Sequence, residues 1–271
     1  MTHRITMCSQ KGGVGKTTVS LNLALAMAER GRKVLLVDLD PQGGIGHALA
    51  RGDTELVGLA DLLMEQISPE EAVLPTRVPN LSLLPRGRLD PVDACEYELA
   101  VGARGVLSSS LSRVDGPFDV VVIDTPSGLG LVTRAALAAS DFALMPFQAE
   151  PLALRSVSQA LRVIDRVRLT ENPRLELLGI LPTMVDRNND PSHDVMLEMW
   201  TGFEGVLDTA IPRADVFSKA SAMGLPVGFL PGRISPEARR FEMLAAELDT
   251  HMLMLKPEME TTHEQPQRAL L

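Results

Sequence analysis

A glycine-rich segment near the start of the chain constrains the fold more than any other part of the sequence. Residues 11–18 read Lys-Gly-Gly-Val-Gly-Lys-Thr-Thr; the apolar run 5–8 precedes them, and leucines and alanines at helical spacing follow them. A strand, a glycine-rich turn and the start of a helix, in this order, form a loop that binds nucleotide phosphates, because glycine lets backbone N–H groups approach phosphate oxygens. The sequence therefore predicts an α/β nucleotide-binding fold.

Two side chains of this loop match the needs of a nucleotide triphosphate. Lys16 supplies an ammonium for the β- and γ-phosphates, and the Thr17 hydroxyl is suited to ligate the Mg²⁺ that they carry. The backbone expected to surround the phosphates belongs to the other loop residues, Gly12, Gly13, Val14, Gly15 and Thr18. We therefore expect a nucleotide triphosphate and Mg²⁺ as the ligands of this loop.

A second lysine in the loop points to a second subunit. The common phosphate-loop pattern has a glycine where this chain has Gln10, and Lys11 comes next. Two ammonium groups crowded on the same phosphate oxygens would repel each other. We therefore expect Lys11 to reach across an interface to the nucleotide of a second subunit, which predicts a homodimer that forms on ATP binding.

Carboxylates follow two further apolar runs. The runs 34–37 and 120–123 show no polar alternation, as expected of parallel strands covered on both faces, and Asp38, Asp40 and Asp124 follow them. Ligands of such sheets bind beyond the carboxyl ends of the strands, so these carboxylates should meet the loop. We expect Asp124 to hold Mg²⁺ through a water molecule, and Asp38 to hydrogen-bond the loop and Mg²⁺-bound water.

The alternation of patterns along the chain predicts a doubly wound, mainly parallel α/β sheet of about seven to eight strands with helices on both faces. No linker-like stretch interrupts it, so residues 1–255 are expected to form a single domain and 256–271 a disordered tail. Strands are expected near 4–9, 33–38, 80–85, 119–124, 142–147, 176–183 and 207–211. Helices are expected near 16–30, 97–113, 129–140, 151–168, 191–204 and 234–252.

Several blocks of the sequence, in order, resemble the ParA/MinD family of deviant Walker A ATPases, which are P-loop nucleotide hydrolases. The blocks are 11–18, 34–43, 118–126, 179–186, 211–213 and 222–227, and the match covers residues 3–250. The resemblance implies three catalytic residues: Lys16, Lys11 as the signature lysine acting in trans, and Asp40, which positions or activates the attacking water. It also implies slow hydrolysis until a partner completes the site.

The resemblance also favours ATP over GTP. GTP-specific relatives carry an Asn-Lys-x-Asp signature, and none occurs where the base should lie. The segments that match the adenine side place Pro212 against the purine and Asp186, or backbone near it, at the edge of the base. A purely structural role for these two residues remains the alternative.

Basic residues suggest where DNA would bind. The net charge of −9 argues against general affinity for nucleic acid, but members of the family bind DNA without sequence preference through a local basic patch that is complete in the dimer. Val216 stands where the family has a DNA-contacting arginine. The candidates here are Arg155, Arg162 and Arg166, which share one helical face, and Arg187, Lys219, Arg239 and Arg240. A solvated helix face is the alternative interpretation.

The family resemblance implies a switch that positions or segregates a cargo, either DNA such as a plasmid or chromosome, or a large protein complex. A ParB-like protein or a cargo adaptor would activate it, and the protein would be cytoplasmic and associated with the nucleoid. A MinD-like membrane switch is the alternative, but the segment 241–255 contains Glu242, Glu247 and Asp249, so no membrane contact is expected.

A metabolic enzyme related to the nitrogenase iron protein is a further alternative. It would need cysteines placed for a metal cluster shared between subunits, and neither Cys8 nor Cys95 has a suitable setting. The sequence therefore favours the positioning switch.

Overall fold

A seven-stranded sheet forms the centre of the part of the chain that the structure, a computed structural model, describes: residues 2–48, 56–150, 152–186 and 190–255. The strand order is β3-β4-β2-β5-β1-β6-β7, and every pair is parallel except β3–β4. The strands are β1 His3–Met7, β2 Val34–Asp38, β3 Leu74–Pro75, β4 Leu81–Leu84, β5 Val120–Asp124, β6 Phe142–Gln148 and β7 Glu176–Thr183. The predicted α/β fold with a mainly parallel sheet is confirmed.

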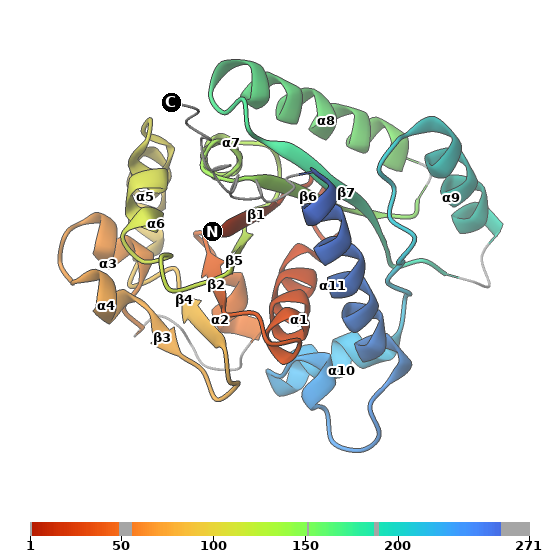
Figure 1. Cartoon of the computed structure of the whole chain (residues 1–271), viewed down its shortest axis with the longest axis horizontal. Helices are drawn as coiled ribbons and strands as arrows, with labels where there is room; N and C mark the ends of the chain where they lie inside the picture. Colours follow the sequence, from red (N-terminus) through yellow and green to blue (C-terminus); the bar gives the residue numbers. More distant parts are fainter. Residues whose placement is uncertain (1, 49–55, 151, 187–189, 256–271) are drawn as a thin grey trace, which may run out of the picture.

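Helices cover both faces of this sheet (Figure 1). They are α1 Lys16–Glu29, α2 Gly44–Ala48, α3 Leu59–Leu63, α4 Pro69–Ala72, α5 Ala94–Gly102, α6 Val106–Ser112, α7 Leu131–Ala138, α8 Ala153–Thr170, α9 Asp190–Gly202, α10 Asp215–Met223 and α11 Pro236–Leu255. Successive side chains of a strand point to opposite faces, so the central strands divide the core. Val34 and Leu36 pack with α1 and α11, whereas Leu35 and Val37 pack with α3, α5, α6 and α7.

A third apolar cluster lies where the β6–β7 edge of the sheet meets α8 and α9. Val157, Ala160 and Ile164 of α8 pack there with Met145 and Ile180 of the strands. The opposite face of α8 is exposed, as its helical spacing predicts.

The strand expected at 207–211 does not form. Leu207 and Ile211 donate backbone hydrogen bonds to β7, but only isolated bridges result, at Val206 and Pro212. Between them, the amides of Asp208 and Thr209 donate to the Glu247 carboxylate of α11, at 2.7 and 3.0 Å. A carboxylate on a neighbouring helix thus takes the hydrogen bonds that a continuous strand would have used.

The single helix expected near 97–113 is two helices. Ala103 has an extended backbone that ends α5, and Gly105, with φ of 79°, begins α6. The unpredicted short elements of the described residues are α2, α3, α4, α10, the two-residue strand β3 and the 3₁₀ turns Pro91–Asp93 and Val227–Phe229. The other expected elements are present with their ends shifted by a few residues.

The last helix is a packing element. Phe241, Leu244 and Leu248 of α11 are buried against α1 and the sheet. Within the described ranges, no helix combines the length and apolar character needed to cross a bilayer. The expected tail, 256–271, lies outside the described residues, as does Arg187.

Candidate active site

The phosphate loop connects β1 to α1 at the carboxyl end of the central strand. Gly15 is the N-cap of α1, and its left-handed backbone, with φ of 90° and ψ of 21°, is one that a residue with a side chain adopts only under strain. No side chain caps this end of α1, and its first turn carries no acidic residue. The N–H groups of the first turn and the positive end of the helix dipole are therefore available to an anion.

Lys16 lies beneath the loop rather than in solvent. Lys16 is only 6% exposed, and its Nζ donates a hydrogen bond to Ser9 Oγ at 3.1 Å. Burial lowers the pKa of Lys16, and the nearby carboxylates of Asp124 and Asp40 oppose that effect. The ammonium is thus held in place by the fold before any phosphate arrives.

Asp124, at the end of β5, forms the acidic partner of the loop. It is fully buried, and its carboxylate accepts hydrogen bonds from Thr17 Oγ1 at 2.7 Å and Ser20 Oγ at 2.8 Å. Burial raises its pKa to about 6, while these two hydrogen bonds act in the opposite direction. A hydroxyl and a carboxylate together offer the hard oxygen ligands that Mg²⁺ prefers, so the residues present fit the ion.

The start of α2 approaches this pair closely. A Cβ placed on Gly44 would lie 3.1 Å from Thr17 Oγ1 and 3.8 Å from Asp124 Oδ2. Any side chain there would crowd the oxygen atoms that fit Mg²⁺. No pattern in the sequence indicates this role of Gly44.

Asp38 and Asp40 differ in surroundings although they lie two residues apart. Asp38 pairs in register with Asp124 across β2 and β5 and is fully buried, which together with the Asp124 charge raises its pKa well above the usual range. Its carboxylate accepts from the amides of Asp40 and Ile45, each at 3.0 Å, so it holds the loop that follows β2. Asp40 is partly exposed, and its Oδ1 accepts from the amide of Gln42 at 2.9 Å.

Lys11 lies at the edge of the site, and its side chain does not enter the buried space beneath the loop that Lys16 occupies. Its Nζ lies 3.5 Å from Glu150 Oε2, and the two side chains are 38% and 45% exposed. Gln148 Nε2 donates to the other carboxylate oxygen of Glu150. The two lysines of the loop therefore point to different surroundings, one buried and one near solvent.

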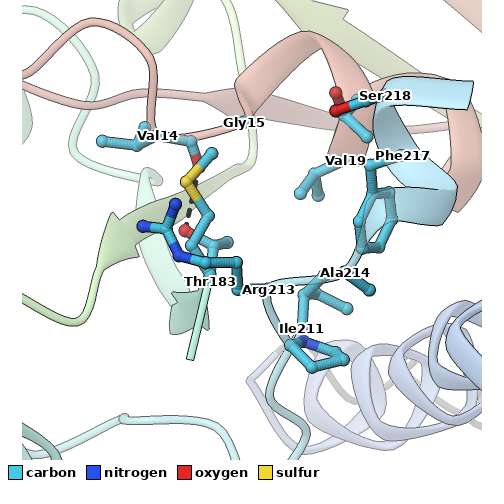
Figure 2. A pocket seen from close by; sticks show the side chains of 12 residues that line it. Val14, Gly15, Val19, Thr183, Ile211, Arg213, Ala214, Phe217 and Ser218 are labelled. Atoms are coloured by element: carbon cyan, nitrogen blue, oxygen red, sulfur yellow. Dashed lines mark hydrogen bonds between the residues drawn. The ribbon is translucent and has the colours of Figure 1, made fainter. Parts of the chain in front are cut away.

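A hollow of about 160 Å³ lies beside the loop where a base would follow the phosphates. Figure 2 shows Val14 and Arg213 on one side of it and Phe217 on the other. The hydroxyl of Thr183 holds this side of the loop by donating to the carbonyl of Val14 at 2.9 Å. The lining comprises Val14, Gly15, Thr18, Val19, Thr183, Met184, Ile211, Pro212, Arg213, Ala214, Phe217 and Ser218.

Of the two expected base contacts, Pro212 lines this hollow and Asp186 does not. The Asp186 amide donates to Ser192 Oγ of α9 at 3.3 Å. Pro212 also forms part of the wall of a second hollow, of about 430 Å³, which Trp200 and Leu197 line from α9.

Several residues of the site escaped the sequence analysis. Ser20 follows Lys16 at helical spacing, a signal that could have placed its hydroxyl beside Asp124. Met184 has a positive φ of 51°, which no local pattern indicates, and Phe217 belongs to the unpredicted helix α10. The base side is thus the part of the site that the sequence revealed least.

The basic residues expected to bind DNA form two separate sets. Arg155, Arg162 and Arg166 are exposed along α8, and Arg162 and Arg166 line a groove of about 580 Å³ with Gln10 and Arg134. Lys219 lies on α10 and Arg239 and Arg240 at the start of α11. Figure 1 shows α8 at the top of the view and α10 at the bottom. Val216 packs against Ala220, Val227 and Ala238.

Comparison with known proteins agrees with this geometry. A family model described as an AAA domain matches residues 2–177. The chromosome partitioning protein ParA of Caulobacter vibrioides is 38% identical over 229 residues, which are 82% of this chain and 85% of that protein. The chromosome-partitioning ATPase Soj of Thermus thermophilus is 39% identical over 251 residues, 91% of this chain and 95% of that protein.

Solved structures share the whole fold. The cobyrinic acid a,c-diamide synthase of Mycobacterium smegmatis, solved with ADP and magnesium, has a TM-score of 0.77 and 35% identity over 93% of this chain and 95% of that one. The cell division ATPase MinD of Pyrococcus furiosus has a TM-score of 0.74 and 28% identity over 92% of this chain and 99% of that one. Together with the loop, the strand-end carboxylates and the second lysine, these matches establish that the chain belongs to the ParA/MinD family of deviant Walker A ATPases.

Proposed function

We propose that this chain is an ATP-hydrolysing switch that dimerises on binding ATP and positions or segregates a cargo. The observation that carries this proposal is the separation of the two loop lysines: Lys16 is buried beneath the loop, and Lys11 is half-exposed at its edge. Within one subunit, Lys16 binds the phosphates of the nucleotide that the same subunit holds. Lys11 is accessible to the nucleotide of another subunit.

The residues that would hold the substrate follow from the geometry. The first turn of α1 and Lys16 bind the phosphates, and the base enters the hollow beside Pro212 and Phe217. Thr17 and, through water, Asp124 would hold Mg²⁺, which would supply positive charge beside the phosphate oxygens. Asp38 holds the loop after β2, which carries Asp40, through the amides of Asp40 and Ile45.

Asp40 and Lys11 complete the reaction centre. Asp40 is partly exposed at the edge of the site, and its carboxylate orients the water that attacks the terminal phosphate. Lys11 from the second subunit stabilises the transferring phosphoryl group. A positive side chain supplied to the phosphoryl group in this way raises the rate about 10³–10⁵-fold. The isolated subunit therefore hydrolyses ATP slowly, and the ATP state lasts until a ParB-like or adaptor protein completes the site.

The proposed output is DNA binding by the ATP dimer without sequence preference, in the cytoplasm and on the nucleoid. Each subunit offers few cations, and a two-fold dimer doubles the contacts on one surface. The two separate basic sets, on α8 and on α10–α11, are alternative surfaces for this contact. The cargo is DNA itself or a protein complex carried along it.

Neither rival function gains support from the described residues. The apolar side chains Phe241, Leu244 and Leu248 of α11 are buried in the core, so they are not available to a membrane. Cys8 is fully buried and its pKa is raised to about 12, whereas Cys95 is exposed on α5. The two cysteines therefore do not form one site.

Two measurements test the proposal. Asp40→Ala is expected to bind ATP and Mg²⁺, to dimerise in light scattering, and to lose hydrolysis; hydrolysis at the parent rate would remove Asp40 from the mechanism. Asp119→Ala, at the opposite end of the sheet, is the matched control for the loss of a carboxylate.

Gel shifts with unrelated duplexes test the output. The ATP state of Asp40→Ala should bind DNA and the ADP state should not, with log affinity falling against log salt at a slope of about −4 to −5 for roughly four to six neutralised phosphates. Replacing Arg155, Arg162 and Arg166 together, and in a second variant Lys219 and Arg239, assigns the surface. Equal binding in both nucleotide states, or none at low salt, would contradict DNA binding as the output.

A further inference from the structure

Two buried side chains hold the backbone on either side of Asp40. Arg86, which follows β4, donates from Nη1 to the carbonyl oxygen of Pro41 at 2.6 Å. Tyr97, on α5, donates from its hydroxyl to the carbonyl oxygen of Leu39 at 3.4 Å. The carbonyls immediately before and after Asp40 thus each accept a hydrogen bond from the same region of the chain.

Both donors are buried, and burying a polar side chain costs free energy unless it is hydrogen-bonded. Arg86 is 6% exposed and Tyr97 is 2% exposed. Among the described residues, no carboxylate within ion-pair distance of Arg86 is found; its bonds go to the carbonyls of Pro41 and Gly87. Burying a guanidinium without a carboxylate partner costs free energy, and an apolar residue would fill this space at a lower cost in free energy.

The backbone segment that carries Arg86 is itself held by hydrogen bonds. The Pro85 carbonyl accepts from the amide of Leu59 at 2.9 Å, and the Arg86 carbonyl from the amide of Ala60 at 2.8 Å. The buried carboxylate of Asp61 accepts from the amide and the Nε of Arg88, at 3.1 and 2.8 Å. Helix α3 therefore anchors the segment that carries the guanidinium.

Local contacts at Asp40 restrict the rest of the turn. The Asp40 amide donates to Asp38 Oδ1 at 3.0 Å, and the Asp40 carbonyl accepts from Gly43 at 2.8 Å. Burial, followed by the Asp38 charge, raises the pKa of Tyr97, so its hydroxyl keeps its proton and remains a donor. With both flanking carbonyls held, the remaining freedom at Asp40 is in its side chain.

We infer that Arg86, assisted by Tyr97, is a positioning residue that holds the Asp40 turn in the geometry required for hydrolysis. This inference rests on the proposed role of Asp40 in orienting the attacking water. Arg86 itself does not touch the substrate; it acts by fixing the backbone from which the carboxylate extends. Misplacement of a catalytic group by about 1 Å can cost about 10²-fold in rate.

The test separates turnover from binding and from stability in the full-length chain. Arg86→Met keeps an unbranched apolar stem and removes the guanidinium with its two hydrogen bonds, and we expect turnover of ATP per folded molecule to fall about 10–100-fold. The dissociation constant of a fluorescent ATP analogue should change by no more than about 3-fold, since the phosphate loop is untouched. Arg86→Lys retains one donor and should recover most of the rate, and Tyr97→Phe, which removes the longer hydrogen bond, should lower it only about 2–5-fold.

Hydrogen exchange supplies a readout that a general structural role would not give. Amides of the 39–44 turn should exchange faster in Arg86→Met, while those of β5 remain protected. Arg77→Met is the control for the loss of a guanidinium, because Arg77 is exposed between β3 and β4 and takes no part in holding the Asp40 turn or the segment that carries Arg86.

The outcomes are distinguishable. Folded Arg86→Met with parental turnover, or with slower turnover and unchanged exchange of the turn, overturns the inference, and so does failure of Arg86→Lys to recover any rate. If Asp40→Ala retains hydrolysis, the proposed function of Asp40 fails first. If Asp40→Ala is inactive and Arg86→Met is not, only the positioning role of Arg86 is wrong.

Discussion

The two lysines of the phosphate loop belong to regions of opposite character. Around Lys16, the site is buried and already hydrogen-bonded: Ser9 holds the ammonium, and Thr17 and Ser20 hold the Asp124 carboxylate. Around Lys11, one ion pair of 3.5 Å joins two half-exposed side chains. The first region is organised by the fold of one chain, and the second is not.

This difference explains how one loop can serve two subunits. Groups that act within their own chain gain from being fixed beforehand, because no reorganisation is needed when charge develops. A group that acts on another chain must leave its partner, and an exposed pair is worth only about 0.2–1 kcal/mol, so the release of Lys11 from Glu150 costs little. The contrast can be tested one side chain at a time.

The largest effect is expected for Lys11→Ala. Hydrolysis should fall by about 10³–10⁵ because the transferring phosphoryl group loses this positive side chain, while ATP binding to the monomer is retained. Mixing Lys11→Ala with Asp40→Ala places an intact Lys11 opposite an intact Asp40 in one of the two sites of a mixed dimer, and this site should recover activity. Full partner-stimulated turnover by Lys11→Ala alone would show that Lys11 is an ordinary loop residue.

Lys16→Ala should instead abolish ATP binding. A hydrogen bond to a charged group contributes about 1.5–3 kcal/mol, and the lost ammonium makes more than one, so affinity should fall by about 10²-fold or more. Equilibrium titration with a fluorescent ATP analogue measures it. Lys33→Ala, an exposed lysine at the amino end of β2, is the control; normal binding by Lys16→Ala would refute the phosphate-loop assignment.

Ser20→Ala should reduce the stability of the nucleotide-free and magnesium-free protein by about 1–3 kcal/mol, because buried Asp124 loses a donor. The pKa of Asp124 is raised to about 6 in the folded chain, above an unfolded value of about 3.9. The contribution of Asp124 to the free energy of unfolding therefore falls as the pH rises from about 3.9 to about 6. The Ser20 hydroxyl helps the charged form, and its loss should therefore matter more at pH 7 than at pH 4.

Urea denaturation at the two pH values measures this difference. Ser20 Oγ also lies 3.0 Å from the carbonyl oxygen of Lys16 in its own helix. Ser158→Ala is therefore the control, since Ser158 Oγ lies 2.8 Å from the carbonyl oxygen of Leu154 in the same way, on the exposed face of α8. An equal loss at both pH values would mean that Ser20 does not act through the charge of Asp124.

The smallest effect is expected for Glu150→Gln. Removing one member of an exposed pair should change the free energy of unfolding by less than about 1 kcal/mol. Denaturation of the monomer without nucleotide gives the value. A loss above about 2 kcal/mol would place Lys11 and Glu150 among the organised groups and remove the contrast between the two regions.

The sequence predicted those features that depend on short, local patterns. The loop, the apolar strands and the carboxylates at their ends are of this kind, and Asp38 and Asp124 indeed pair in register. The missing strand near 207–211 depends instead on Glu247, a residue far along the chain whose carboxylate takes two amides. No local pattern contains that information.

The same reasoning separates the residues of the site. Lys16 and Thr17 were identified because the loop positions them by spacing alone. Phe217 and Met184 reach the base side only through the packing of α10 and the turn after β7. Arg86, after β4, reaches the Asp40 turn after the neighbouring strand β2. Long-range contacts of this sort become visible only in three dimensions.

The chain carries one tryptophan, Trp200, and it lies half-exposed on α9 at the hollow that shares Pro212 with the base side. Its indole is thus the single strong intrinsic fluorophore of the molecule, and Pro212 lines both the hollow that Trp200 lines and the hollow beside the phosphate loop. Because the Trp200 side chain is half-exposed, a ligand or partner that covers it would change the emission of the indole, and no label is needed. The protein thereby contains its own optical probe of the base side.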